Sequence, residues 1–387
     1  MKLPIDLKAV IEAATDIESA RSTPVSVSVL IDDSAPGDVA AHVRSAFVGA
    51  GAHARVTVGY FAGPAFSPYE GDDMAVVVAG FSEEVGRRAA EIRAAGVPVM
   101  VVTSMPSLVA DMASAYGNPI PEGDLVAPEG VEGCEADGDA ACASGEVAGA
   151  HVSVFAGIRA AKSAGAGAAA GFAGAAASSP DALDAPIPID AAAACALDRR
   201  MGEWVVAACR EKRLALALSF PFVRKPLSLE AVSATSLQNA GIGLVLFIPG
   251  ADMPLMTLNQ AKMLLQIAAA YGEPMSAARV KELAAIVAGG FACRSVARQV
   301  AGAVPAIGWA VKAGVGYAGT KAMGLAAVEY FERGGNIAGL AGVVSSATAK
   351  ATQIAGDVAA TPAGARVLST VKTAVRQGAA SVLKKTE

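Results

Sequence analysis

The sequence predicts an α/β domain with a parallel sheet, followed by an all-helical bundle. Three observations predict this order: short β-rich runs alternate with helical stretches over residues 25–117, longer helical patterns follow residue 191, and an Ala/Gly-rich segment separates the two. The 387 residues are 53% hydrophobic and only 17% charged, against about 25% charged in typical globular domains. Global disorder is therefore excluded.

Four apolar runs are the expected strands of the first domain, residues 1–120. These runs are Val25–Ile31, Ala54–Val58, Met74–Ala79 and Val97–Thr103. We expect helices over Pro36–Gly49, from Ser82 as a cap to Ala95, and near Leu108–Tyr116. Because the strands are apolar on both faces, they are typical of a parallel sheet that helices cover on both sides.

Residues 121–190 are predicted to be a linker, since the chain is acidic and Gly/Pro-rich up to Gly149 and low-complexity Ala/Gly over 163–180.

A helical domain is expected over 191–335. Its helices are expected over Asp198–Arg213, Leu227–Ile248, Thr257–Ala270, Ser276–Val287, Arg294–Val304 and Ile307–Phe331. Residues 336–387 form an Ala-rich basic tail, for which we keep two hypotheses: a loosely packed terminal helix or a basic amphipathic segment.

The two halves of the chain differ in charge. Residues 1–150 carry 8 Lys/Arg and 22 Asp/Glu, whereas residues 151–387 carry 23 and 14. Either the halves attract each other, or the basic half meets an anionic surface such as lipid headgroups or nucleic acid. Nucleic acid is not expected as a partner, because aromatic residues are only 5% of the chain and no recognition motif is present.

The cysteines and histidines give no catalytic or metal-binding pattern. The five cysteines are an odd number without a CxxC pair, so we expect free thiols in a reducing compartment. His42, His53 and His151 have no acid or cysteine partner at a useful spacing, which argues against a catalytic triad or a zinc site. Residues 1–22 contain four acids and no uninterrupted apolar run, so we expect no signal peptide and a cytoplasmic location.

The loop after the first expected strand lacks the residues of a phosphate-binding loop. A GxxxxGK motif followed by Ser or Thr supplies a lysine for the phosphates and a hydroxyl for magnesium. Here the loop is Asp32–Asp38 (DDSAPGD), which has three aspartates, no lysine and only Gly37 as a glycine. The G-x-G-x-x-G motif of dinucleotide-binding domains is also missing, because Gly37 is the only glycine of this loop. We therefore expect no nucleotide cofactor.

The order of these strands and loops resembles the last part of an Era-like GTPase domain, in which one strand ends in the guanine-recognising NKxD. Thr103-Ser104-Met105-Pro106 stands at that position without the Asn, Lys or Asp, and no DxxG follows a middle strand. The resemblance implies a GTPase-like domain that has lost its lysine, its metal ligand and its base-recognition motif. The alternative is a GTP-binding protein or GTPase with an unconventional phosphate loop.

A series of short motifs lies within residues 215–335: Leu237-Gln238-Asn239, the IPGADMP turn at Ile248–Pro254, Asn259-Gln260 with Met263, Tyr271-Gly272, Gly289-Gly290-Phe291, Arg294 with Arg298, Pro305 with Gly308, and Gly319-Thr320 to Gly324. In their order and spacing these motifs resemble a bacterial domain of unknown function that is appended to some Era-like GTPases and occurs in small inner-membrane proteins. The resemblance implies a family, but the family has no established function to carry over.

The uncharged stretch Ala231–Ala251 is nominally long enough to cross a bilayer. Five polar residues interrupt it, and only Ala240–Ile248 is continuously nonpolar. A helix buried in the bundle, with Gln238 and Asn239 hydrogen-bonded to neighbours, is favoured over insertion. A sharper hypothesis is a re-entrant or interfacial hairpin over Leu237–Leu258.

We select eight candidate interaction residues in the helical domain and no catalytic, cofactor-binding or metal-binding residue. Asp252, Asn259 and Gln260 form either a polar site at the mouth of the bundle or local turn and backbone contacts. Tyr271 is expected to anchor the core with a polar tip. The full set is Gln238, Asn239, Asp252, Asn259, Gln260, Tyr271, Arg294 and Arg298.

These observations together predict a non-enzymatic bacterial scaffold of unknown role, with a partner that is either an anionic membrane surface or a protein. The basic residues of the second half supply attraction to anionic lipid, each worth up to about 1 kcal/mol near such a surface. The sequence predicts a protein on the cytoplasmic side, free or associated with the cytoplasmic membrane.

Overall fold

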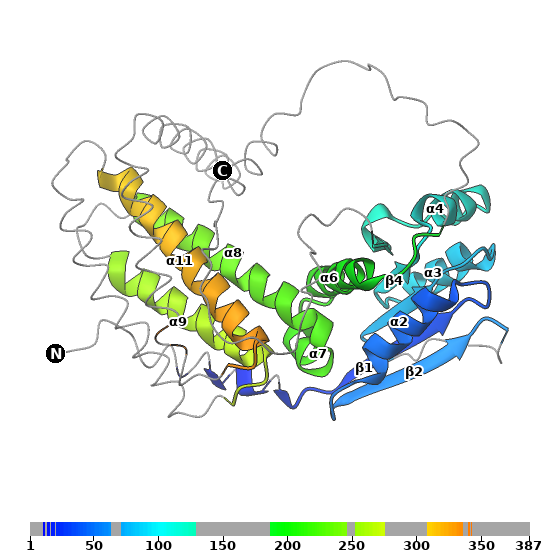
Figure 1. Ribbon diagram of the computed structural model, residues 1–387, viewed down its shortest axis with the longest axis horizontal. Coiled ribbons are helices and arrows are strands. Elements are labelled where there is room, and N and C mark those ends of the chain that lie inside the picture. The colour runs from blue at the N-terminus through cyan, green and yellow to red at the C-terminus, as the bar shows by residue number, and fades with distance from the viewer. Residues whose placement is uncertain are drawn as a thin grey trace, which may run out of the picture.

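The computed structural model describes residues 11, 14, 15, 17–19, 21–62, 71–128, 186–245, 252–274, 308–335, 340 and 342. In these ranges a parallel sheet lies at one end of the molecule and long helices lie at the other (Figure 1). The predicted order of an α/β region before a helical region is therefore confirmed. The helices expected over Ser276–Val287 and Arg294–Val304 lie outside the described residues, as does most of the tail.

The sheet has five parallel strands in the order β2-β1-β3-β4-β5. The strands are β1 (Val25–Ile31), β2 (Ala54–Tyr60), β3 (Met74–Val78), β4 (Val99–Val102) and β5 (Leu125–Val126). The first four are those that the apolar runs predict. β5 was not predicted, because a run of two residues shows no periodicity. It lies inside the segment expected to be a linker and pairs with β4.

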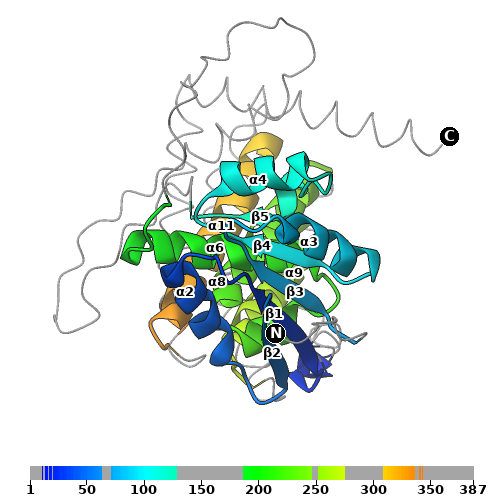
Figure 2. The same cartoon turned by 90° about the vertical axis from the view of Figure 1, so that its right-hand side faces the viewer.

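Helices cover both faces of the sheet (Figure 2). α3 (Glu84–Ala94) and α4 (Pro106–Ala115) share one apolar cluster with Val77 and Val101. Side chains alternate between faces along a strand, so the neighbouring Val76 and Val102 point to the other side. There they belong to a cluster with α2 (Gly37–Val48), α6 (Ala191–Ala208) and α7 (Arg213–Ser219).

α6 is tied to the sheet by polar contacts as well as by its apolar side chains. Trp204 is buried, and its indole N–H donates to an Asp124 carboxylate oxygen at 3.4 Å. A guanidinium N–H of Arg200 donates to the Ala127 carbonyl at 3.1 Å. Just beyond α6, the Lys212 ammonium lies 2.7 Å from an Asp73 carboxylate oxygen. The helices that follow the expected linker thus complete the second face of the sheet.

His42 on α2 is paired with Asp198 on α6, at 2.8 Å between Nε2 and Oδ1. No partner for His42 was predicted, because this carboxylate lies 156 positions further along the chain. The hydrogen bond to Asp198 raises the pKa of the imidazole, burial opposes that shift, and the charge of Asp198 adds to it.

We expect the pair to stabilise the fold at acidic pH and to lose this effect as pH rises. The folded-state pKa lies above the ordinary value of 6.5, so the contribution is complete below pH 6.5 and disappears as pH passes the folded value. Asp198 is 40% exposed, so solvent screening holds the gain below about 1 kcal/mol. A double-mutant cycle with His42→Gln and Asp198→Asn, measured by denaturant unfolding, should give a coupling energy at pH 5.5 that is absent at pH 8.5. Equal coupling at both pH values would contradict the assignment.

The helical region is built from α8 (Pro221–Val245), α9 (Asp252–Ala270) and α11 (Gly308–Glu332). α8 and α11 pack closely, since a Cβ added at Gly324 would lie 2.4 Å from a methyl carbon of Val232. Leu264, Ile267 and Met323 are fully buried in the cluster that these helices share with Ala14 and Ile17 of the N-terminal segment. Pro226 lies inside α8, which begins six residues before the expected start at Leu227.

Among the helices that the structure describes, none combines the length and the apolar character needed to cross a bilayer. The last residues of the uncharged stretch, 246–251, lie outside the described ranges. Asp252–Pro254, the end of the turn in the hairpin hypothesis, form the start of α9.

Candidate functional site

The carboxyl edge of the sheet between β1 and β3 is the first place to look for a site. In doubly wound sheets, ligands bind where the chain leaves neighbouring strands in opposite directions. Here that point lies between β1 and β3. From β1 the chain passes to β2 on one side, and from β3 it passes to β4 on the other side. The two loops that meet there follow Ile31 and Val78.

The Asp32 carboxylate fills the space between these loops. It is 3% exposed and accepts hydrogen bonds from the backbone N–H of Gly80 at 2.9 Å and of Ser82 at 3.3 Å. It also accepts from the N–H and the hydroxyl of Ser34, at 3.1 and 2.9 Å. Three backbone N–H groups of the kind that would bind a phosphate therefore already bind a carboxylate of the protein itself.

The same two loops approach so closely that only glycine fits at position 80. A Cβ added to Gly80 would lie 2.3 Å from the carbonyl carbon of Ser34 and 2.4 Å from the N atom of Ala35. The Phe81 N–H donates to the Ser34 hydroxyl at 2.8 Å, which adds a further bond between the loops. The backbone of one loop thus closes over the other.

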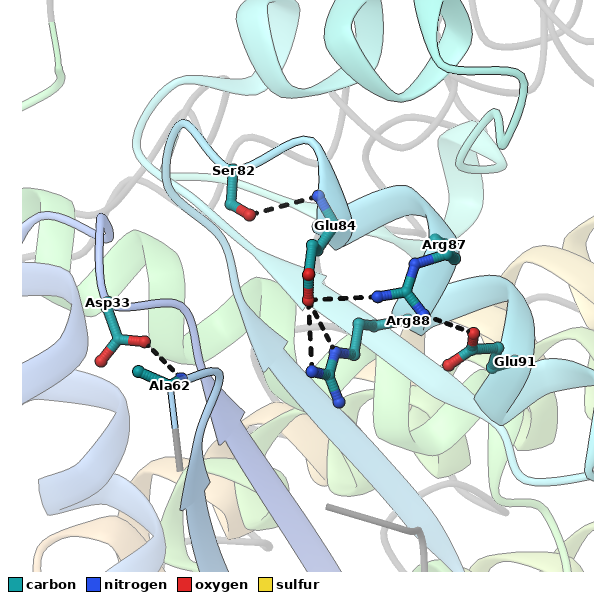
Figure 3. Close-up of polar contacts among 7 residues, drawn as sticks. All are labelled: Asp33, Ala62, Ser82, Glu84, Arg87, Arg88 and Glu91. Carbon is teal, nitrogen blue, oxygen red and sulfur yellow. Dashed lines mark hydrogen bonds and ion pairs between the residues drawn. The ribbon is translucent and has the colours of Figure 1, made fainter. Parts of the chain in front are cut away.

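Charged side chains at the rim of this edge are occupied by neighbours (Figure 3). Asp33 accepts from the Ala62 N–H at 2.7 Å. Glu84 pairs with Arg88 and Arg87, at 3.2 Å to each, and Arg87 also pairs with Glu91 at 2.7 Å. Ser82, expected as the cap of this helix, precedes the helix by two residues and accepts from the Glu84 N–H. Arg87 and Arg88, the cations of α3 at this rim, are therefore both engaged in ion pairs.

The end of β4, where a guanine-recognising motif would stand, is covered by the segment 186–190. The Ile187 N–H donates to the Ser104 carbonyl at 3.1 Å, and the Ile189 N–H donates to an Asp38 carboxylate oxygen at 3.1 Å. Thr103 and Ser104 are fully buried. The Thr103 hydroxyl accepts from the Met105 N–H, so it serves the local turn. Thr103 and Ser104 therefore present neither the carboxylate nor the amide with which an NKxD motif recognises guanine.

A buried polar cluster, formed by Asn239, Asn259, Gln260 and Thr320, joins the three long helices. The Thr320 hydroxyl accepts from the Asn239 amide at 2.9 Å and from the Gln260 amide at 2.8 Å. The Asn259 amide donates to Asn239 Oδ1 at 3.1 Å, and the Asn239 amide also reaches the Met256 carbonyl at 3.4 Å. Asn239, Gln260 and Thr320 are at most 1% exposed. Three of the eight candidate residues therefore meet, around a threonine not chosen from the sequence.

Thr320 was noted only within the Gly319-Thr320 to Gly324 motif, because a single threonine in an apolar helix resembles an ordinary helix position. Only the packing of α11 against α8 and α9 shows that its hydroxyl faces two buried amides.

The other candidates are distributed differently. Gln238 is exposed, although it lies beside Asn239 on α8. The Tyr271 ring stacks on Phe331 with centroids 5.9 Å apart, and burial raises the pKa of its phenol. Asp252 is the first residue of α9. Arg294 and Arg298 lie outside the described residues.

The thiols and acids in the described part of the chain do not gather into a metal site, since no group of three or more His, Cys, Asp or Glu lies together there. Burial raises the pKa of the Cys209 thiol to about 12, with Asp73 as the second cause. At neutral pH this sulfur is protonated, so it is a poor nucleophile.

Comparison of the whole chain with protein-family models, with curated proteins and with solved structures gives no match.

Proposed function

We propose that this protein is a non-enzymatic scaffold that binds a protein partner or the cytoplasmic membrane surface, with a GTPase-like α/β domain that does not bind nucleotide. The observation that supports this most directly is the buried Asp32 carboxylate, which accepts from the Ser34, Gly80 and Ser82 N–H groups. A phosphate at this position would meet a carboxylate and lose the donors that bind it.

The helical region supports binding rather than turnover. We propose that α8, α9 and α11 form the core of a helical bundle of the family that residues 215–335 resemble. Their buried polar cluster fixes one arrangement of the helices, because each amide there needs a defined partner. The excess of basic residues after residue 150 supplies attraction to an anionic surface.

Guanine nucleotides should leave the thermal midpoint of the full chain unchanged. A nucleotide with a Kd of about 10 µM, present at about 1 mM, would add about 2.7 kcal/mol of stability, a shift of several degrees. We expect shifts below about 1 °C for GDP, GTP and a non-hydrolysable GTP analogue, each with magnesium, measured by scanning fluorimetry. A saturable shift of several degrees would favour the alternative, a GTP-binding protein with an unconventional loop.

Fractionation of cells that express the full chain separates the two kinds of partner. We expect release from the membrane pellet by high salt, because the attraction proposed is electrostatic and is screened. Retention through both high salt and alkaline carbonate would indicate insertion of the 231–251 region. A chain found in the soluble fraction from the start would favour a protein partner over the membrane.

A further inference from the structure

We propose that a cleft between α8 and α9 binds a small monocarboxylate with a short apolar chain. The cleft has a volume of about 300 Å³, at the lower end of the range for small-molecule sites. α7 and Ile17 of the N-terminal segment complete its wall. The helices α8 and α9, which form its walls, lie apart from the parallel sheet (Figure 1).

Helical spacing places one continuous set of side chains along each wall. On α9 the lining residues Asn259, Lys262, Met263 and Gln266 recur at intervals of three and four. On α8, Leu227, Glu230, Ala231, Ala234 and Gln238 recur in the same way. Residues at these intervals share one face of a helix, so the two faces form a lined groove.

Two cations, Arg213 and Lys262, line the cleft. Arg213 pairs with Glu230 at 2.6 Å, so these two charges neutralise each other. Lys262 is partly buried, and no carboxylate in the described part of the chain pairs with its ammonium. Other lysines of the same region differ, since Lys225 pairs with Glu332 at 3.1 Å and Lys321 lies 5.7 Å from the Tyr317 ring centre.

The charge and the surface of the cleft together select the ligand. The single ammonium of Lys262, which pairs with no carboxylate among the described residues, balances a monoanion, whereas a phosphate dianion would keep a second negative charge uncompensated. A carboxylate accepts a charge-assisted bond from an ammonium, and the Gln238 and Gln266 amides add neutral donors. Leu214, Leu227 and Met263 provide an apolar wall for a short chain.

Calorimetric titration of the full chain with octanoate tests this proposal, with octanol and octylamine as neutral and cationic probes. We expect one saturable octanoate site, weaker binding of octanol and no binding of octylamine. Lys262→Met should weaken octanoate binding about tenfold or more, because it removes a charge-assisted bond. Lys321→Met, which removes the same charge outside the cleft, should leave the affinity unchanged.

Glu230→Gln provides a test that misfolding cannot imitate. It leaves Arg213 without its carboxylate, so the cleft gains a second free cation and octanoate should bind several-fold more tightly. The proposal is overturned if octanoate does not bind, if Lys262→Met binds it as the unmodified chain does, or if octylamine binds equally well. None of these outcomes depends on nucleotide or membrane binding, so they leave the proposed scaffold function untouched.

Discussion

Replacement of Asp32 by alanine should lower the free energy of unfolding by about 3–4 kcal/mol, one of the two largest effects expected here. The substitution removes the acceptor for the Ser34, Gly80 and Ser82 N–H groups. The Gly80 N–H would remain buried under the closely packed loop without a partner. Urea unfolding followed by circular dichroism measures the change.

Asp33→Ala is the matched control, since it removes the same group one position along the chain. Asp33 is exposed, and its hydrogen bond with the Ala62 N–H lies where water can replace it. We expect a cost below about 1 kcal/mol. Asp32→Asn, which keeps one oxygen, should fall between the two alanine variants. Similar losses for Asp32→Ala and Asp33→Ala would refute the structural role given to Asp32.

Thr320→Val should cost about 2–4 kcal/mol, because valine has nearly the same shape but removes the hydroxyl oxygen to which two buried amides donate. The amides are those of Asn239 and Gln260, both within 2.9 Å of the Thr320 hydroxyl. The entropy of unfolding grows with chain length, and for 387 residues about 1–2 °C is lost per kcal/mol, so the thermal midpoint should fall by roughly 2–8 °C.

Thr320→Ser separates the hydrogen bonds from the packing. Serine keeps the hydroxyl acceptor and loses only a methyl group, so we expect a cost of about 1 kcal/mol. If the serine variant is as unstable as the valine variant, the hydroxyl is not the stabilising group. Asn239→Ala in the Thr320→Val background should then cost less than Asn239→Ala alone, since its partner is already gone.

Features that depend on neighbours in sequence were predicted well. The four apolar runs of the first domain become β1 to β4, and their apolar character on both faces matches a sheet covered on both sides. Three of the eight candidate residues, Asn239, Asn259 and Gln260, lie together, because amides inside an apolar helical stretch need partners.

Features that depend on distant partners were not predicted. Asp32 was interpreted only as one of three aspartates in a loop without a lysine, but its carboxylate also joins this loop to Gly80 and Ser82. His42 was left without an acid until α6 brought Asp198 to it. The shortest strand, β5, exists only because β4 offers its free edge.

By itself, the sequence determined the first four strands, the helices between them and the chemical groups that the first loop lacks. Those properties follow from residue type and local spacing, which determine the backbone conformation of each segment. Only the tertiary structure decided that α6 and α7 cover the second face of the sheet, that Thr320 joins three helices, and that Lys262 lines a cleft. These depend on contacts between segments far apart in the chain, where no periodic pattern specifies the partner.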